Sequence, residues 1–527
     1  MCGIFGLIGY DGYPNNYFET GSKRGPENSK IVRIKNNYLG FHRLAINGLN
    51  SESDQPLYYN QYILVCNGEI YNYKELIQKY NLKMNTQSDC EVIPALYEKF
   101  GDECVKMLDG EFAFILYDTF THEVFIARDP YGVRPLYMNH LYNRYCFASD
   151  LEPLKIMDVS NITQFTPGTY MKINESNINI TTYANYNKTS HTSPENTFEF
   201  YDLFIRAVSK RVNNSDRPIA CLLSGGLDSS LVAAVASRIC AKKGTILETY
   251  SIGLQDSEDL KFAQKVANHI NSIHTTIVCS EDEFYNAIPH VIRDIESYDT
   301  TSVRASVGNW LVGKYIKEHS NAKVVLNGDG ADELMGGYMY FHACPSSLEF
   351  DKECKRLLKN IHYFDVLRSD KSISSHGLEP RTPYLDIELV NYYLNIPAEI
   401  RNHTLNKNIE KHFMRTTIQD IDPTLLPYEI LFRKKEAFSD GVSGLNRSWY
   451  EIIQDRVRAE NIPDEIYLLN PPATDEQRYY RHLFEKYYPN SGYIIPYFWM
   501  PRYVNATDAS ARTLNLYSLN MIQNINK

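Results

Sequence analysis

The chain has 527 residues, a formal net charge of −10, and hydrophobic and charged fractions of 43% and 22%. A chain of this length exceeds the size at which one hydrophobic core stops growing, so we expect at least two domains. The acidic balance and the lack of a basic block argue against nucleic acid or an anionic membrane as the main partner. Phosphate recognition must therefore be built locally, from a few side chains and backbone amides.

Ten cysteines are scattered along the chain and no CxxC pair occurs. This spacing predicts neither a zinc site nor a disulfide framework, and free thiols indicate a reducing compartment. The start, MCGIFG, has no basic segment before its apolar stretch, so we do not expect a signal peptide. No apolar run reaches the roughly 18 residues that cross a bilayer. The sequence predicts a cytoplasmic protein without a membrane partner.

Short aromatic and β-branched runs, separated by Gly, Asn and Asp turns, dominate the chain up to about residue 180. Such runs predict strands. One segment, 91–100, has apolar residues at helical spacing. Many strands with few helices predict a layered α+β domain over residues 2–180. We expect its strands at 4–9, 38–46, 62–66, 112–117, 124–128 and 145–148.

Residues 181–197 have little apolar content and no periodicity, so we place a linker there. Beyond it, apolar strands alternate with helices, which predicts an α/β domain with a doubly wound parallel sheet over 198–527. From Ser346 onward the pattern is mostly helical, with a Tyr-rich tail. We expect helices at 198–212, 229–240, 259–270, 282–297 and 305–319, and strands at 218–223, 249–254, 275–279 and 323–326.

Cys2 becomes the first residue if Met1 is removed, which a small second side chain permits. Its thiol then lies beside its own α-amine, whose pKa of about 8 suits a general base. The thiolate can attack a side-chain amide, giving a thioester and ammonia, and the oxyanion that forms needs hydrogen-bond donors. Taken alone, a cysteine here is more often a small buried hydrophobe.

The surrounding segments change that balance. Five of them, in order and spacing, resemble the class II glutamine amidotransferases, which have an N-terminal-nucleophile (layered αββα) fold. The resemblance covers about the first 180 residues and rests on MCGIFG at the start, KRGP at 23–26, FHRLAI at 41–46, NGEIYN at 67–72 and SDCE at 88–91.

The resemblance implies a role for each matching residue. Arg43 is expected to clamp the α-carboxylate of glutamine, and Asp89 to bind its α-ammonium. The structural alternatives are an Asn-Gly turn between strands at 67–68 and a solvated or helix-capping Asp89. The oxyanion hole is expected from Asn67 and Gly68, and the remaining pocket lining from Glu69 and the backbone near Ile46.

The segment CLLSGGLDSS at 221–230 ends a predicted strand and opens a helix. Two glycines allow a tight turn, and hydroxyls with free N–H groups at a helix N-terminus form an anion cradle. The pattern is neither a kinase-type P-loop nor a dinucleotide fingerprint, and a Ser-capped turn is the structural alternative. It resembles the pyrophosphate loop of ATP pyrophosphatases. The resemblance implies that Asp228 binds Mg²⁺ and that Ser224, Gly225, Gly226 and Ser229 contact ATP.

Further segments extend the resemblance to the glutamine-dependent asparagine synthetases, up to about residue 445. They are YSIGL at 250–254, IESYDTTSVRA at 295–305, LNGDGADE at 326–333, GLEPRTPYLD at 377–386 and RKKEAFSDG at 433–441. By position, Leu222 and Ile252 are expected at adenine and Gly328 at the nucleotide backbone. Lys435 is expected to contact the phosphates in the transition state.

Two positions depart from the family pattern, and two more are expected to bind the acceptor. Asp329 stands where many members carry the Glu needed to form the acyl-adenylate, and Asn327 replaces a common Ser near ATP. Glu333 and Arg381 are expected to recognise aspartate. A buried ion pair between Arg381 and Glu379 is an equally good interpretation of that pair.

The resemblance implies the reaction ATP + aspartate + glutamine + water → AMP + diphosphate + asparagine + glutamate. It proceeds through β-aspartyl-AMP, with ammonia passing between the domains. The partners are then small molecules, with Mg²⁺ accompanying ATP. The sequence does not distinguish a monomer from a homodimer. One rival is a related amidotransferase with another carboxylate acceptor. A rival of a different class is a non-catalytic glutamine sensor or scaffold, which would not need a nucleophile.

Overall fold

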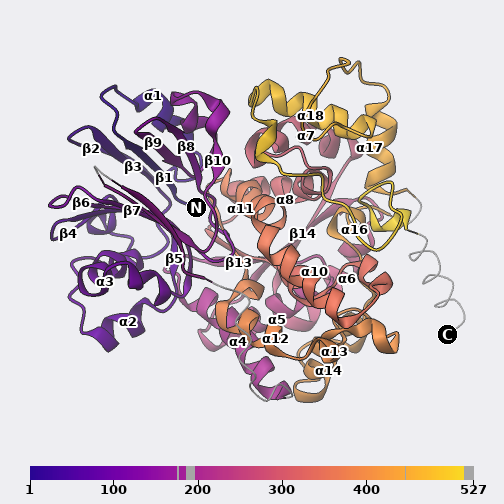
Figure 1. Cartoon of the computed structure of the whole chain (residues 1–527). Helices are drawn as coiled ribbons and strands as arrows, with labels where there is room; N and C mark the ends of the chain where they lie inside the picture. Colours follow the sequence, from indigo (N-terminus) through magenta and orange to yellow (C-terminus); the bar gives the residue numbers. More distant parts are fainter. Residues whose placement is uncertain (175–176, 185–195, 445–446, 515–527) are drawn as a thin grey trace, which may run out of the picture.

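The computed structural model describes residues 1–174, 177–184, 196–444 and 447–514. Two domains lie side by side, with the N-terminal strands on one side and the parallel sheet with its helices on the other (Figure 1). The expected linker at 181–197 falls mostly outside the described residues. Strand β12 (Ile178–Thr182) precedes the undescribed stretch and helix α4 (Thr197–Asn213) follows it. No helix in the described part is long and apolar enough to cross a membrane.

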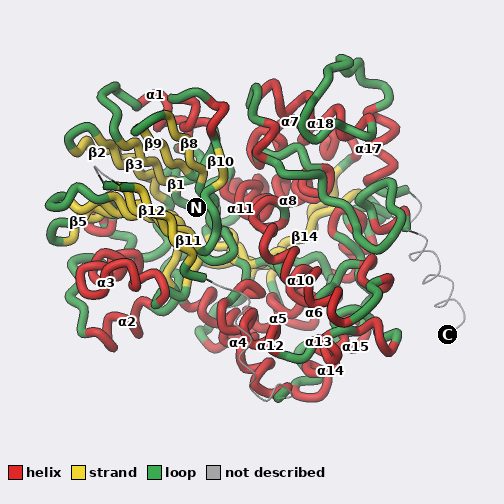
Figure 2. Tube along the Cα trace, in the orientation of Figure 1, coloured by secondary structure: helices red, strands yellow, loops and turns green. Residues whose placement is uncertain are grey.

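The N-terminal domain contains two six-stranded antiparallel sheets packed face to face. The first runs in the order β10 (Thr163–Gln164), β8 (Tyr137–Leu141), β9 (Arg144–Ala148), β1 (Gly3–Ile8), β3 (Asn37–Arg43) and β2 (Asn28–Ile34). The second runs in the order β12, β11 (Thr169–Ile173), β7 (Val124–Arg128), β6 (Gly110–Asp118), β5 (Tyr62–Ile70) and β4 (Leu57–Tyr59). Figure 2 shows these strands as one stacked block.

Strand β6 shows why the sheets stack. Its alternate residues Phe112, Phe114 and Leu116 face one core, and the residues between them face another. Successive side chains of a strand point to opposite faces, so an entirely apolar strand must be covered on both sides. Helices α2 (Tyr73–Tyr80) and α3 (Val92–Phe100) contribute to the first core, and the other sheet covers the second. The predicted α+β layered architecture is confirmed.

The C-terminal domain is built on a five-stranded parallel sheet, as predicted. Its order is β15 (Ile273–Cys279), β14 (Glu248–Leu254), β13 (Ile219–Leu222), β16 (Val324–Leu326) and β17 (Glu379–Arg381). Helices α5 (Leu227–Lys242) and α6 (Glu258–Ile270) pack in the core on one face. Helices α7 (Glu281–Ile295) and α8 (Thr300–His319) pack in the core on the other. The carboxyl ends of the strands therefore meet at one edge, where ligands bind in such sheets.

The C-terminal region packs on this second face through α17 (Trp449–Val457) and α18 (Asp475–Tyr487). Arg304, in the segment TTSVR of α8, is buried against Glu476 and Asp508, with Nη2–Oε2 and Nη1–Oδ1 distances of 2.6 and 2.7 Å. Both acids lie far along the chain. The region therefore completes the core of this domain and does not form a separate one.

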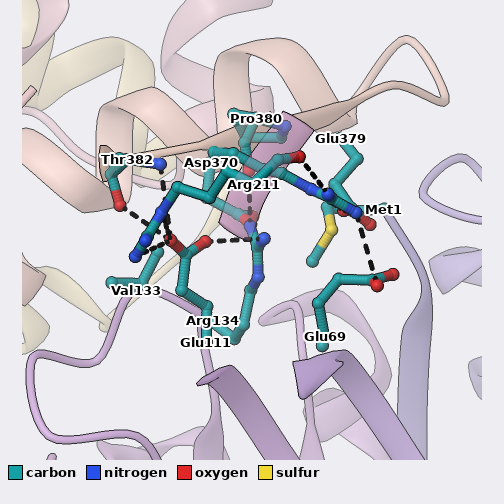
Figure 3. A network of polar contacts seen from close by, with 12 residues as sticks. Met1, Glu69, Glu111, Val133, Arg134, Arg211, Asp370, Glu379, Pro380 and Thr382 are labelled. Atoms are coloured by element: carbon teal, nitrogen blue, oxygen red, sulfur yellow. Dashed lines mark hydrogen bonds and ion pairs between the residues drawn. The ribbon is translucent and has the colours of Figure 1, made fainter. Parts of the chain in front are cut away.

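Buried charges join the two domains. Glu111 at the start of β6 accepts from Arg134 of the same domain at 2.9 Å and from Arg211 of α4 at 3.0 Å (Figure 3). All three side chains are at most 2% exposed. Pairing each guanidinium with the carboxylate offsets the large cost of burying it.

Replacing Glu111 by alanine should therefore leave two buried guanidinium groups without this carboxylate. We expect the free energy of unfolding in urea to fall by about 3–5 kcal/mol. The control is Glu103→Ala, which removes an exposed partner of Lys106 and should cost at most about 1 kcal/mol. Equal losses in the two variants would contradict the importance of this ion pair.

Candidate active sites

Cys2 lies directly before β1, at the end of the strand that pairs with β3. Its Sγ is 3.4 Å from both the carbonyl oxygen and the amide nitrogen of Leu44, which follows β3. The Arg24 guanidinium donates from Nε to the Cys2 carbonyl at 2.9 Å. The thiol is thus at a strand end, where its backbone is fixed by neighbours from the first sheet.

Met1 is buried beside this thiol, and its ammonium donates to the carbonyl of Leu378 at 2.7 Å. Burial lowers the pKa of the Met1 α-amine to about 5 and raises the pKa of the Cys2 thiol to about 12. With Met1 attached, the thiol is therefore protonated at neutral pH. The α-amine that could deprotonate it belongs to the wrong residue, so this geometry favours a nucleophile that forms only after Met1 is removed.

Asn67 and Gly68 lie inside β5, so the alternative of a turn between strands is wrong. Asn67 is fully buried, with Nδ2 3.5 Å from the hydroxyl of Ser149. That hydroxyl also accepts from Ile4 N–H at 3.1 Å, which brings β5 next to the strand that follows Cys2. A Cβ on Gly68 would come within 2.2 Å of the Glu111 carbonyl, so only glycine allows this close approach.

Arg43 and Asp89 are buried and contact protein groups. Arg43 donates to the Asn50 carbonyl at 3.0 Å and pairs with Asp54. Asp89 accepts from Ile70 N–H at 2.7 Å and does not cap the helical turn that it begins, so that alternative is wrong. Burial raises the pKa of Asp89 to about 6. Both side chains flank β3 and β5, the strands beside Cys2, and their contact with glutamine stays a prediction.

Glu69 and Ile46 lie at the boundary with the second domain. Ile46 accepts from Asp216 N–H at 3.0 Å. The Glu69 carboxylate accepts from Asn214 at 3.0 Å and lies 3.3 Å from Arg381 Nη2. Burial is the main reason why the pKa of Glu69 is raised well above its ordinary value. Both residues thus connect the glutamine-site strands to the C-terminal domain.

A pocket opens at the carboxyl edge of the parallel sheet, where the predicted ATP residues converge. Gly225 is not in its lining: its φ of +73° makes the turn, and a Cβ there would meet Ala263 N at 2.4 Å. The predicted residues that do line the pocket are Leu222, Ser224, Gly226, Asp228, Ser229, Ile252, Asn327, Gly328, Asp329, Glu333 and Lys435.

Two lysines and two aspartates face one another on one wall of this pocket. Lys411 Nζ lies 2.6 Å from Asp228 and 2.5 Å from Asp332, and Lys435 Nζ lies 2.6 Å from Asp332. Burial alone would raise the pKa of Asp332, but the two ammonium groups reverse this and lower it. Both carboxylates are therefore next to cations, and oxygen ligands of this kind suit Mg²⁺ held together with substrate phosphates.

A second cluster surrounds Asp329, the residue that departs from the family pattern. Asp329 Oδ1 is 3.4 Å from Arg368 Nη2, and its N–H donates to Asn327 Oδ1 at 3.2 Å. Burial raises the pKa of Asp329. Glu333 pairs with the Tyr338 hydroxyl, and its pKa is raised well above the ordinary value by burial and by Asp365. The substitution by Asn at 327 thus shapes the turn that presents Asp329.

Arg381 is not part of the pocket, which corrects the expectation that it contacts aspartate. It is fully buried at the domain boundary, with Nη2 2.7 Å from Glu379. Its Nη1 donates to the carbonyls of Arg211 and Asn214 at 2.6 and 2.7 Å. The alternative of a buried ion pair with Glu379 is the one that the geometry supports.

Several residues of the pocket were not predicted from the sequence. Asp332 lies within the segment LNGDGADE, so its spacing from Asp329 could have identified it. Asp365 and Arg368 stand in a helix and Lys411 in the turn before one, with no local pattern that distinguishes them from surface charges. The polar residues added by the structure include Asp332, Tyr338, Asp365, Arg368 and Lys411.

An N-terminal-nucleophile sandwich beside an anion-cradle α/β domain defines a glutamine amidotransferase joined to an ATP-using synthetase. The family model for the glutamine amidotransferase domain matches residues 1–190, and that for asparagine synthase matches 199–353 and 344–492. The chain belongs to the asparagine synthase family.

Relatives match almost end to end. The protein named "Asparagine synthetase [glutamine-hydrolyzing]" of Gallus gallus is 40% identical over 563 residues, covering 98% of this chain and 99% of the relative. The proteins of the same name from Cricetulus griseus and Homo sapiens are 39% and 38% identical over 569 residues each, with the same coverage.

Proposed function

We propose that this chain is a glutamine-hydrolysing asparagine synthetase. It converts ATP, aspartate, glutamine and water to AMP, diphosphate, asparagine and glutamate. The observation that carries the proposal is the presence of both sites in one chain. Cys2 lies at a strand end in the same domain as the buried Asn67, and the SGGLDSS loop opens into a pocket with Asp329 and Lys435. A glutamine sensor would need neither a nucleophile nor a pyrophosphate loop.

In the glutamine half, the α-amine of Cys2 takes the thiol proton once Met1 is removed, and the thiolate attacks the amide carbon. The Asn67 amide and the Gly68 N–H stabilise the oxyanion. Arg43 and Asp89 bind the α-carboxylate and α-ammonium of glutamine. Ammonia leaves, and water hydrolyses the thioester to glutamate. The close approach at Gly68 and the burial of Asn67 support these roles.

In the ATP half, Leu222 and Ile252 contact adenine, and the loop from Ser224 to Ser229 contacts the phosphates. Asp228 and Asp332 would bind Mg²⁺, which neutralises charge on the phosphates. Lys435 stabilises the negative charge that develops as diphosphate leaves. The paired lysines and aspartates of this wall support the assignment, because the site already balances opposite charges.

Aspartate is the proposed acceptor, and its β-carboxylate attacks the α-phosphate of ATP to give β-aspartyl-AMP. Glu333 contributes to binding the α-ammonium of aspartate. Its position in the pocket supports this, and Arg368 beside Asp329 offers a cation for a carboxylate. Ammonia then displaces AMP. A different carboxylate acceptor is the remaining alternative, since few residues set this preference.

Product analysis tests the proposal directly. Purified protein is incubated with ATP, Mg²⁺, glutamine and one amino acid at a time from a panel. We expect asparagine, AMP and diphosphate with aspartate only. ADP and phosphate in place of AMP and diphosphate would refute the ATP site, and amidation of another acid would replace aspartate as acceptor.

Replacing Asp228 by asparagine should separate the two activities. The change removes a carboxylate from the Mg²⁺ and phosphate wall but leaves the glutamine domain intact. We expect aspartate-dependent diphosphate release to fall on the order of 10²-fold, with glutamine hydrolysis within about twofold of the wild type. Raising Mg²⁺ should recover part of the rate. The prediction fails if diphosphate release is unchanged at limiting Mg²⁺.

All described cysteines are free, which supports a cytoplasmic location as part of this proposal. The proposed partners are small molecules. Light scattering on the purified chain would decide between a monomer and a homodimer.

A further inference from the structure

Helix α11 (Asp365–Ser374) lies between the two domains (Figure 1). Asp365 and Arg368 line the ATP pocket, while Asp370 and Ser374 contact the N-terminal domain. Residues two positions apart on a helix point about 200° apart. One helix therefore presents opposite faces to the two candidate active sites.

The face toward the N-terminal domain binds Arg24. The guanidinium donates from Nη2 to the two oxygens of Asp370 at 2.6 and 3.1 Å, and from Nη1 to the Ser374 hydroxyl at 2.9 Å. The Arg24 side chain is 2% exposed and that of Asp370 is 1% exposed. A charge-assisted bond in a dry site is stronger than its surface equivalent. Asp150 also lies near this guanidinium, with Oδ1 3.4 Å from Nη1, but Asp370 makes the two shorter bonds and is therefore its main anchor.

Arg24 in turn contacts the nucleophile. Its Nε donates to the carbonyl oxygen of Cys2 at 2.9 Å. After Met1 is removed, Cys2 has no preceding residue, so the bond from Met1 to Leu378 is lost and the carbonyl contact remains. The carbonyl carbon, the α-amine and the side chain of Cys2 share one Cα. A shift of the carbonyl therefore moves both the base and the thiol.

The opposite face of α11 contacts the carboxylate of the ATP pocket. Arg368 Nη2 lies 3.4 Å from Asp329 Oδ1 and also pairs with Asp365 on the same helix. A ligand that changes the charge around Asp329 therefore changes the electrostatic attraction between Asp329 and Arg368. A continuous set of polar contacts thus runs from Asp329 through α11 and Arg24 to Cys2.

We propose that Asp370 is a positioning residue for the Cys2 nucleophile, acting through Arg24, and that α11 couples glutamine hydrolysis to occupation of the ATP pocket. The inference rests on the proposed function. Asp370 touches no substrate in this account. Its effect is on the geometry of the thiol and amine, where a displacement of about 1 Å costs on the order of 10²-fold in rate.

The test uses Asp370→Asn in the full chain. Glutamine hydrolysis is measured alone and with ATP, Mg²⁺ and aspartate, beside ammonia-dependent synthesis. We expect kcat for hydrolysis to fall about 10–100-fold while KM for glutamine and ammonia-dependent synthesis stay within about twofold. In the wild type, ATP, Mg²⁺ and aspartate should raise hydrolysis at least about fivefold. That stimulation should disappear in the variant.

Rescue and control variants separate positioning from folding. Asp370→Glu should recover part of kcat, because the carboxylate can still reach Arg24. Ser374→Ala removes one bond to Arg24 without removing a charge and should lower kcat about 3–10-fold. Asp202→Asn, an exposed residue paired with Arg206, should change nothing. If Asp370→Asn does not fold, the test rests on Ser374→Ala. An unchanged kcat for glutamine hydrolysis in that variant would then overturn the proposal.

Other outcomes are equally decisive. A parallel loss of hydrolysis and ammonia-dependent synthesis in Asp370→Asn would make the residue structural and overturn the proposal. Wild-type hydrolysis that does not respond to ATP and aspartate would overturn the coupling. Failure of the proposed function gives a different result: the wild-type protein would make no glutamate from glutamine, or no asparagine from ammonia.

Discussion

Replacing Cys2 by alanine should abolish glutamine hydrolysis and glutamine-dependent synthesis while ammonia still supports asparagine formation. The variant loses the thiol proposed to form the thioester, and loss of a catalytic nucleophile lowers kcat on the order of 10⁴-fold or more. The synthetase pocket lies in the other domain, and Cys2 is not part of its lining.

The measurement compares glutamate release, and asparagine formation from glutamine and from ammonia, in one preparation. Cys279→Ala, a change at the edge strand of the parallel sheet, is the control and should retain all three activities. Equal loss of the glutamine and ammonia activities in Cys2→Ala would contradict two separate sites. Intact mass adds a check: a chain that retains Met1 should not use glutamine, because burial keeps the pKa of its thiol at about 12.

Replacing Asp329 by asparagine should abolish acyl-adenylate formation, measured as aspartate-dependent exchange of diphosphate into ATP. The pocket then lacks the carboxylate proposed to organise attack on the α-phosphate, and we expect a loss on the order of 10²-fold or more. Glutamine hydrolysis should persist. Asp464→Asn, at a highly exposed carboxylate, is the control. Normal exchange in Asp329→Asn would exclude Asp329 from this role and leave Asp332 or Glu333 as candidates for the carboxylate.

A second substitution at position 329 tests whether the turn compensates for aspartate being shorter than the Glu of many family members. One missing methylene withdraws the carboxylate by about 1.5 Å relative to Glu. Gly328 and Gly330 flank Asp329, and the Asn327 side chain accepts the Asp329 N–H, so the turn can present the shorter acid. Asp329→Glu should therefore retain some exchange. No exchange at all would mean that the turn fits aspartate alone.

Sequence patterns predict the strands that are buried on both faces and read as apolar runs. In the N-terminal domain they miss the strands β2, β4, β8, β10, β11 and β12. The predicted strand at 124–128 matches β7, and the one at 249–254 lies within β14. The short strand β17 was not predicted, because Glu379 and Arg381 are charged and the strand forms only where the domains bury them.

Residue roles at the ATP pocket followed from the resemblance where the motif is local, as in SGGLDSS. They failed for Arg381, because no pattern in GLEPRTP shows that its guanidinium turns toward the other domain. Lys411 and Arg368 could not be found from sequence, because chain segments more than a hundred residues from the loop at Asp228 bring them to it. Long-range packing, which local patterns do not encode, decides such positions.

The buried charges at the domain boundary restrict how this chain can be divided. Arg24 and Asp109 of the first domain have partners in Asp370 and Lys210 of the second. A separately expressed N-terminal half would leave Arg24 with Asp150 alone and without its closer partner Asp370. Exchanging one half for that of a distant relative would mismatch these pairs. We therefore expect a working chimera to require matched substitutions on both sides of the boundary.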